Sequence, residues 1–455
     1  MDYKEYQEYR EYFVKLIDTK QLKELKDALE EINVVDLAEI IEDMDDKHML
    51  IVFRLIPKLV GAEVFSYMET FNQLRIINSI TDTELHIIID ELDFDDRIDI
   101  IEEMPANVVT KVLAKSTPEE RKMINEFLRY PEDSAGSIMT IEYVHLKPDM
   151  TVKAAMEYIK KTGMDKETIY TCYVENEYKM LLGFVSLRTI VISDENLLIK
   201  DIMEEDVIFV TTTDDRELVA DQFIKYGYIA LPVVDSEHRL CGIITFDDIM
   251  DVVEEEATED FHKMAAVNPS YDEYLDQTPW QLAKNRIPWL LILMISATLT
   301  SGIIDNFSYI ISQYIILTMF IPMITDTGGN TGSQSSTIVI RAMATGEITL
   351  ADALKVMLKE MEVGLIAGAV LATVNFLRMI LFTDAGLVVS GLVSFTVLIT
   401  VILSKLLGAT LPMLAKRAHI DPAIMASALI TTIIDSLVLI IYFLLAGWLL
   451  PLTGI

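Results

Sequence analysis

A single carboxylate stands inside a long apolar stretch near the end of the chain. Asp435 lies in ALITTIIDSLVLIIYF, with Thr431 and Thr432 one helical turn before it. A carboxylate at membrane depth is costly and usually marks an ion or proton path, although it can also be a neutral, hydrogen-bonded group inside helix packing. Mg²⁺ requires octahedral oxygen ligands and sheds its water reluctantly, so a carboxylate can hold the hydrated ion through water. The pattern favours an ion path at Asp435, and a carboxylate there suits hydrated Mg²⁺.

A second polar segment, TDTGGNTGSQSS (325–336), interrupts another apolar stretch. Gly-rich polar backbone at this depth is tolerated only against protein or a watery cavity, and close helix packing through small residues is the alternative interpretation. If the segment lines a path, Gly328, Gly329 and Asn330 are its lining candidates, together with the two threonines before Asp435. The apolar spans hold neither Cys nor His, which gives soft-metal transport little support.

Carboxylates also crowd a third segment, residues 247–264, which reads DDIMDVVEEEATEDFHKM. Its apolar residues fall on one side of a helix, with carboxylates over the rest. A solvated connector helix is the plain interpretation. However, so many like charges repel each other unless cations are present. The segment is therefore a candidate for binding cations.

Charge separates the two parts of the chain that must position these groups. The chain has 455 residues, 51% of them hydrophobic, and a formal net charge of −34. Residues 287–455 hold nine acidic and seven basic side chains, so residues 1–286 hold 62 acidic and 30 basic ones. This predicts a soluble, very acidic region followed by a membrane domain. The charge disfavours nucleic acid and anionic lipid headgroups as partners and favours cations, although acidic surfaces also simply keep proteins soluble.

The soluble region changes texture near residue 130. Apolar residues recur at helical spacing over residues 1–130, which predicts an all-α solenoid with a regulatory role. Beyond it, strands and helices alternate in a duplicated β-α-β-β-α unit of about sixty residues. Cys172 and Cys241 fall in separate predicted strands and suit neither a disulfide framework nor a zinc site. The charged N-terminus MDYKEYQEYREYF lacks a signal region, so we expect the soluble part to be cytosolic.

The membrane domain is expected to contain five spans. Their predicted ranges are Ile287–Ile304, Ile310–Ala344, Leu350–Leu381, Gly386–Leu411 and Pro422–Leu450. Basic residues favour the side that carries the soluble part, which gives a cytosolic N-terminus and an outside C-terminus. An odd number of spans precludes a simple two-fold inverted repeat within one chain, so a pore on the axis of a homodimer is a natural alternative.

Two strand ends of the duplicated unit resemble those of tandem cystathionine-β-synthase (CBS) domains. They are LGFVS (182–186) and CGIITFDD (241–248). CBS domains commonly bind adenine nucleotides or ions as sensors, and their ribose-binding Asp lies three residues after the Ser/Thr. Asp248 takes that place in the second copy, but Thr189 takes it in the first. The resemblance therefore implies at most one complete nucleotide site and leaves ATP binding open.

Over essentially its full length the chain resembles the MgtE family of magnesium channels. The resemblance rests on YPEDSAG (130–136), the acidic helix, GGNTGSQ (328–334) and the DPA and TTIIDS motifs between 421 and 436. It implies a multidomain membrane protein: an all-α N-terminal solenoid, α/β tandem CBS domains, a connecting plug helix and a five-helix α transmembrane domain, forming a homodimer. The corresponding ranges are 1–130, 131–199, 200–253, 247–270 and 271–455.

The resemblance also implies roles for single residues. Asp435 takes the place of the central pore aspartate that holds hydrated magnesium. Regulatory Mg²⁺ would bind carboxylates of the second CBS domain, the plug, the start of the fifth span and the N-terminal domain: Asp248, Asp251, Glu256, Glu259, Asp260, Asp421, Glu91 and Asp95. Ions bridging these groups would draw the domains together and close the pore, and their loss would open it.

The chain is thus interpreted as a Mg²⁺ uptake channel of the inner or plasma membrane. A coupled carrier of Mg²⁺ or Co²⁺, and a membrane magnesium sensor that transports nothing, are the alternatives. An enzyme is not expected, because the sequence contains no GxxxxGK[ST] or HExxH motif and no nucleophile–His arrangement.

Overall fold

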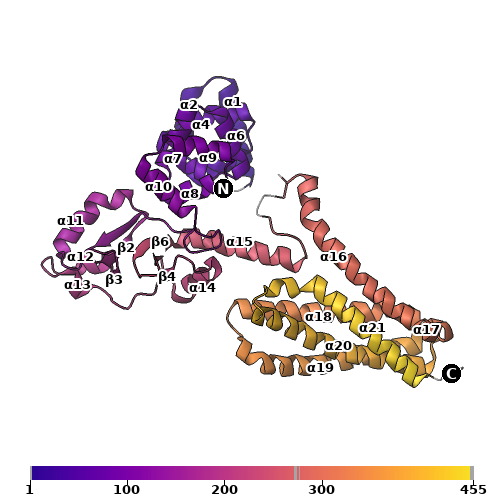
Figure 1. Cartoon of the computed structure of the whole chain (residues 1–455). Helices are drawn as coiled ribbons and strands as arrows, with labels where there is room; N and C mark the ends of the chain where they lie inside the picture. The colour runs from indigo at the N-terminus through magenta and orange to yellow at the C-terminus, as the bar shows by residue number, and fades with distance from the viewer. Residues whose placement is uncertain (1–2, 271–273, 276, 451–455) are drawn as a thin grey trace. The chain divides into compact units, whose positions relative to one another are not determined.

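The chain folds as two compact units, residues 1–253 and 254–455 (Figure 1). The computed structural model describes residues 3–270, 274–275 and 277–450. The first unit holds the short helices and the strands, and the second holds the long apolar helices. The boundary between the units falls inside one helix, ahead of the change in charge that the sequence shows at residue 286.

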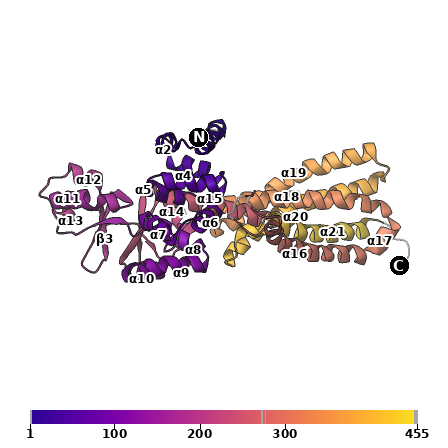
Figure 2. The same cartoon turned by 90° about the horizontal axis from the view of Figure 1, so that it is seen from above.

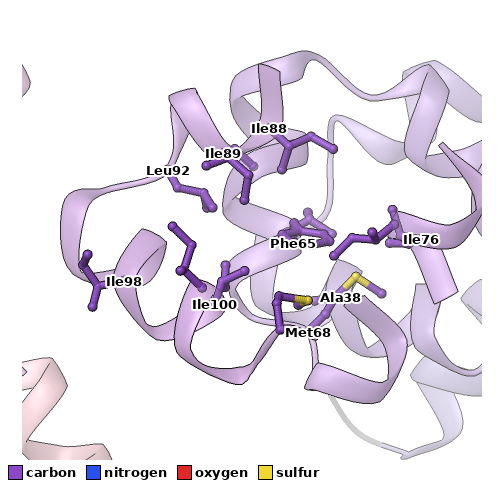
Figure 3. Close-up of a cluster of buried hydrophobic side chains, with 14 of the residues drawn as sticks. Ala38, Phe65, Met68, Ile76, Ile88, Ile89, Leu92, Ile98 and Ile100 are labelled. Carbon is purple, nitrogen blue, oxygen red and sulfur yellow. The ribbon is translucent and has the colours of Figure 1, made fainter. Parts of the chain in front are cut away.

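Short helices build the N-terminal part of the first unit, as the helical spacing predicts. They are α1 (Tyr3–Asp18), α2 (Leu22–Leu29), α3 (Val34–Glu42), α4 (Asp46–Leu55), α5 (Lys58–Ser66), α6 (Thr70–Ser79), α7 (Asp82–Glu91), α8 (Phe94–Glu103), α9 (Ala106–Lys115) and α10 (Pro118–Phe127). Polar caps start several of them: Asn33, Asp45, Thr81 and Thr117 each accept a backbone N–H of the first turn. Each helix gives its apolar face to one shared core, part of which Figure 3 shows around Phe65 and Met68.

Two three-stranded sheets follow, one in each copy of the duplicated unit. The first contains β1 (Tyr143–Leu146), β2 (Thr168–Glu175) and β3 (Leu181–Ser186), and the second contains β4 (Val210–Thr211), β5 (Ala230–Val234) and β6 (Leu240–Thr245). In each sheet the first pair of strands is parallel and the second is antiparallel. The helices of these copies are α11 (Val152–Thr162), the 3₁₀ turn η1 (Gly163–Asp165), α12 (Leu187–Ile192), α13 (Ile199–Ile202) and α14 (Arg216–Tyr226). The predicted duplication is confirmed.

The N-terminal helices and the second sheet share one hydrophobic core within the first unit. Phe94 and Phe127 of the helices belong to the same buried cluster as Val233 and Ile244 of the sheet. The segment that leads into the first copy also pairs with the second, since Thr140 bridges Ile243. This continuous packing fixes the start of α8 beside the end of β6, where the acidic side chains described below meet.

The acidic helix is α15 (Phe246–Met264), which begins directly after β6. Ile249 and Val252 on its first turns are buried in the core of the first unit. The remainder, from Glu254, belongs to the second unit. The predicted plug helix is thus one continuous helix with residues in both units.

Long helices dominate the second unit. They are α16 (Pro279–Asn306), α17 (Ser308–Gln313), α18 (Ile321–Ala344), α19 (Ala353–Phe382), α20 (Gly386–Arg417) and α21 (Ser427–Leu449), with the 3₁₀ turns η2 (Ile315–Phe320), η3 (Leu350–Asp352) and η4 (Pro422–Met425). Figures 1 and 2 show α18, α19, α20 and α21 running side by side. Val393, Ile434 and Tyr442 are among the residues of the core between them.

The predicted second span differs from what is observed. Residues 310–344 do not form one helix, because α17 ends at Gln313, the 3₁₀ turn η2 follows, and α18 begins at Ile321. Within the described residues, four helical segments are long and apolar enough to cross a membrane: 279–306, 350–382, 386–417 and 422–449. Helix α18 is not among them because its polar segment lowers its hydropathy. A count of five spans therefore depends on α18 crossing beside its more apolar neighbours.

Candidate ion-binding sites

Four carboxylates gather where the N-terminal helices meet the second sheet, and we call them the bare carboxylate cluster: Asp95, Asp96, Glu167 and Asp248. Asp95 and Asp96 lie in the first turn of α8, and Asp248 lies in the first turn of α15. Asp248 accepts hydrogen bonds from the Thr245 backbone N–H at 3.2 Å and from its hydroxyl at 2.6 Å. Glu167 directly precedes β2. Two of the four, Asp95 and Asp248, are sequence-predicted sites that the fold brings together.

Burial and mutual repulsion make this cluster unfavourable when it is ionised. Burial, followed by the charges of Asp248 and Glu167, raises the pKa of Asp95 to about 9. Burial also raises the pKa of Glu167 to about 7 and that of Asp96 to about 6. The pKa of Asp248 is raised by burial despite its hydrogen bonds to Thr245. In the described part of the chain, the buried Oδ1 atom of Asp95 has no hydrogen-bond partner, so the cluster lacks positive charge where it needs it.

Three other predicted regulatory residues lie outside this cluster. Glu91 is exposed at the last position of α7. Asp251 is exposed on α15, one turn beyond Asp248, and Glu256 is half-buried further along the same helix. Asp96 and Glu167 belong to the cluster, but they were not among the residues predicted from the sequence. Asp96 adjoins Asp95 and could have been found from that adjacency, but Glu167 is a single Glu before a strand and carries no such signal.

A second acidic group, in the second unit, contains its own cation, and we call it the lysine-held cluster: Glu259, Asp260, Lys263 and Asp421. The Lys263 ammonium lies 2.6 Å from Asp421 Oδ2 and 2.5 Å from Glu259 Oε1. Burial lowers the pKa of Lys263, but its hydrogen bonds to Asp421 and Glu259 outweigh burial and raise it. Burial and the charge of Asp421 raise the pKa of Asp260. The fold thus brings three predicted carboxylates together around a lysine that the sequence analysis did not select.

Asp435 lies on α21, half-buried, and faces the polar segment of α18. The charged group that acts on it within the described residues is another carboxylate, Asp326. Asp326 and Asn330 are exposed on α18, one helical turn apart. Asp326 was passed over in the sequence analysis, although it belongs to the TDTGGN segment. Two carboxylates near each other on apolar helices favour a divalent cation between them.

The glycines of the polar segment serve close packing. Gly328 and Gly329 are buried, and a methyl group at either would lie within 3 Å of Ile434 or Thr431. The segment remains a regular helix within α18, so the packing interpretation holds for these two glycines. Thr431 and Thr432 are half-buried on α21. Of the lining candidates, Asn330 is the one exposed in the single chain.

In the residues that the structure describes, no three His, Cys, Asp or Glu side chains are arranged to hold a metal ion together. The bare carboxylate cluster offers four carboxylates and the lysine-held cluster three, in each case more widely spaced than the ligands of a single closed metal site. Mg²⁺ commonly keeps several waters and binds proteins through one or two carboxylates. Such sites fit the donor sets present here, and the unpartnered, buried Asp95 oxygen is the clearest sign of one.

A cavity of about 210 Å³ lies between the two sheets. Tyr173 and Phe184 line it from the first copy, and Tyr228 and Pro232 line it from the second. At the predicted ribose positions, the Thr189 hydroxyl lies 2.8 Å from that of Ser186, whereas Asp248 bonds Thr245. Asp248 thus accepts a backbone N–H at the start of α15, whereas Thr189 bonds the hydroxyl of Ser186, the N-cap of α12.

Models of known families match most of the chain. The model described as a divalent cation transporter, MgtE, matches residues 321–445, and that of the MgtE intracellular N domain matches residues 32–133. The CBS domain model matches twice, at residues 135–194 and 199–255.

Solved structures resemble the first unit. The soluble part of a magnesium transporter is 29% identical, with a TM-score of 0.52, and covers 55% of this chain and 99% of that one. The cytosolic domain of the Mg²⁺ channel MgtE in complex with ATP is 34% identical, with a TM-score of 0.50, and covers 53% of this chain and 99% of that one.

Similar proteins match across both units. The magnesium transporter MgtE of Thermus thermophilus is 36% identical over 90% of this chain and 91% of its own length. That of Bacillus subtilis is 31% identical over 87% of this chain and 90% of its own length. The acidic soluble part, the duplicated CBS sheets and the membrane helices are thus all matched in one order. The chain belongs to the MgtE family of magnesium transporters.

Proposed function

We propose that Mg²⁺ crosses the membrane past Asp435 and Asp326, in a homodimer whose pore lies on its two-fold axis. The observation that carries the proposal is the pair of neighbouring carboxylates on α18 and α21. Uncompensated carboxylates are expensive between apolar helices, and a divalent cation offsets that cost. Because Mg²⁺ keeps its water, the two side chains select for charge while contacting the ion through its hydration shell.

The homodimer is inferred from the exposed polar face of α18. Asp326, Asn330 and Gln334 follow one another at four-residue spacing and are exposed in the single chain. A polar stripe of this kind cannot face lipid, so it must face protein or water. A second copy across a two-fold axis supplies both, since it encloses a watery path and doubles the carboxylates that line it.

Regulation is proposed to use the two clusters described above. Mg²⁺ on the bare carboxylate cluster would tie α8 to α15 by neutralising Asp95, Glu167 and Asp248. Mg²⁺ on the lysine-held cluster would tie α15 to the start of α21 through Asp421. Ions that bind better when these elements are close favour the closed state by their difference in affinity. Asp251, one turn beyond Asp248 on α15, would extend the first of these sites, whereas Glu91 at the end of α7 lies outside it.

The proposed location is the cell membrane, with the soluble unit in the cytosol. Lys284 and Arg286 lie near the start of α16, before its apolar stretch, and Lys416 and Arg417 end α20, ahead of the last apolar helix. Such basic flanks mark the cytosolic side of membrane helices.

ATP is proposed as a further ligand of the cavity between the sheets. A relative's cytosolic domain has been solved in complex with ATP. The cavity here is lined by aromatic side chains suited to a base. Asp248 is the ribose ligand that the resemblance implies, but it lies outside the lining of this cavity, and Thr189 leaves the first copy without a carboxylate at that position.

The test is to record Mg²⁺ current across excised patches while cytosolic Mg²⁺ is stepped from near zero to millimolar levels. We expect current that falls as cytosolic Mg²⁺ rises, and a loss of about tenfold or more in Asp435→Asn, with a smaller loss in Asp326→Asn. Asp384→Asn, an exposed carboxylate between α19 and α20, is the matched control and should conduct normally. Mg²⁺ uptake without current would favour a coupled carrier. The absence of both uptake and current would favour a sensor.

A further inference from the structure

An ion pair that none of the sites above uses is buried among the membrane helices. The Lys405 ammonium on α20 lies 3.6 Å from Glu360 Oε2 on α19, and the side chains are only 8% and 14% exposed. The Ser335 hydroxyl on α18 donates to Glu360 Oε2 at 2.6 Å and accepts from Lys405 at 3.1 Å. Ser335 itself is fully buried. We call these three residues, each on a different helix, the polar latch.

Stability alone does not account for the polar latch. A buried ion pair gains little over well-packed apolar residues, because desolvation of both charges offsets their attraction. Ionisable residues among membrane helices are also rare and usually functional. The latch instead supplies directional bonds, which fix how the three helices are rotated relative to one another.

The helix that the polar latch fixes is the one that carries Asp326. Ser335 follows Asp326 by nine residues, about two and a half helical turns, so the two project from opposite sides of α18. The latch therefore holds the back of the helix whose front is the exposed polar stripe. A rotation of α18 about its axis would move Asp326 and Asn330 together.

The backbones of α18 and α20 pack closely beside the polar latch, so a change in the latch is transmitted to the backbone of α18. A methyl group at Gly408 of α20 would lie 2.3 Å from the Gly332 carbonyl oxygen and 3.0 Å from Ser335 Cβ. On the neighbouring face, the Ser336 hydroxyl donates to the Met425 carbonyl of η4 at 3.0 Å. Successive serines thus connect α18 to three neighbouring segments.

We propose that Lys405, Glu360 and Ser335 are positioning residues that hold α18 at one rotation and so determine which cations the pore admits. This inference rests on the proposed ion path past Asp326 and Asp435. Displacements of about 1 Å at a functional group can change rates by two orders of magnitude. The latch should therefore affect selectivity among ions more than the number of working channels.

The experiment measures the permeability of Mg²⁺ relative to Na⁺, from reversal potentials in excised patches containing the full-length protein. Lys405→Met and Glu360→Gln should each lower this ratio by about threefold or more, because a freed α18 displaces Asp326. The exchange of both residues, Lys405→Glu with Glu360→Lys, should recover most of the ratio. Lys355→Met is the matched control, since Lys355 pairs with Asp352 at the exposed start of α19, and its ratio should equal that of the wild type.

A structural role alone would change the amount of protein in the membrane and leave the ratio unchanged in every variant, which would overturn the inference. So would an exchanged pair that behaves like the single variants. If a single variant fails to reach the membrane, the neutral double variant Lys405→Met with Glu360→Gln replaces it, because it leaves no unpaired buried charge; a wild-type ratio there also overturns the inference. Absence of Mg²⁺ current in the wild type would instead sink the proposed ion path.

Discussion

The two acidic clusters of this chain handle the same electrostatic problem in different ways. In the lysine-held cluster, Lys263 contacts Asp421 and Glu259 within 2.6 Å, so the carboxylates have a cation of their own. In the bare carboxylate cluster, Asp95 is 9% exposed and faces Asp248 and Glu167. The rise in the pKa of Asp95 is the consequence, since protonation replaces the missing cation.

The difference indicates how each cluster should respond to Mg²⁺. An ion entering the bare carboxylate cluster gains the full attraction of unpaired carboxylates. An ion entering the lysine-held cluster must compete with an ammonium that is already in contact. We therefore expect the first cluster to depend strongly on Mg²⁺ and the second weakly. Substitutions that exchange these properties test the comparison.

The largest expected effect follows from removing the buried charge. Asp95→Asn should stabilise the soluble fragment, residues 1–270, by ~2–4 kcal/mol at pH 8 without Mg²⁺, because the amide needs no proton and no cation. The difference should vanish below about pH 3, where the carboxyl is protonated in both the folded and the unfolded state. Thermal unfolding followed by circular dichroism measures both. Glu91→Gln, an exposed charge on α7, should leave stability unchanged; a stabilisation as large as that of Asp95→Asn would show that the effect is general.

The wild-type fragment should itself lose stability as pH rises. The carboxyls of the bare carboxylate cluster have higher pKa values in the folded state than in the unfolded state, so the folded state holds their protons more tightly. Their contribution to the free energy of unfolding is therefore greatest below about pH 4. It falls as the pH passes Asp96 near 6, Glu167 near 7 and Asp95 near 9. We expect a decline of ~2 kcal/mol between pH 5 and 9, discounted for solvent screening of the partly exposed Glu167. Millimolar Mg²⁺ should flatten this decline, and an equal slope with and without Mg²⁺ would contradict the cluster's role.

Sequence reasoning recovered the elements but only part of these clusters. Helical spacing and alternating strands are local patterns, so the short N-terminal helices and the duplicated sheets were predictable. Asp95 and Asp248 were selected through family resemblance. Glu167 was not, because it precedes β2 of the first sheet and comes near Asp95 only through tertiary packing. Lys263 was not selected either, since its contact with Asp421 spans more than 150 residues.

The membrane unit shows the same limit. The polar segment of α18 was visible in the sequence, but which face each residue takes was not. Gly328 and Gly329 are buried against α21, while Asp326, two residues earlier, is exposed. The observed break at Tyr314 likewise depends on backbone angles that hydropathy does not report.

A lysine placed in the bare carboxylate cluster should make it resemble the other one. Glu167→Lys puts an ammonium beside Asp95 and Asp248, so the Mg²⁺-free fragment should gain ~1–2 kcal/mol and respond less to Mg²⁺. Thermal unfolding with Mg²⁺ titrated from zero to about 20 millimolar measures the response. The free energy of unfolding should rise with the logarithm of the Mg²⁺ concentration only in the wild type. Glu91→Lys adds the same charge at an exposed site and should retain the wild-type response. If both variants lose the response equally, net charge rather than position is responsible.

The smallest expected effect comes from the reverse exchange, removal of the lysine from its cluster. In Lys263→Met, Asp421 and Glu259 lose the ammonium and become a better site for Mg²⁺. The full-length protein should then close at about three- to tenfold lower cytosolic Mg²⁺, equivalent to ~1 kcal/mol. Excised-patch currents at stepped Mg²⁺ measure the shift. Lys355→Met removes a lysine from an exposed pair and should leave the closing concentration unchanged. A shift of the closing concentration to higher Mg²⁺ in Lys263→Met would mean that Lys263 itself stabilises the closed state. Both clusters would then use a cation to hold the closed state, Mg²⁺ in one and the lysine ammonium in the other.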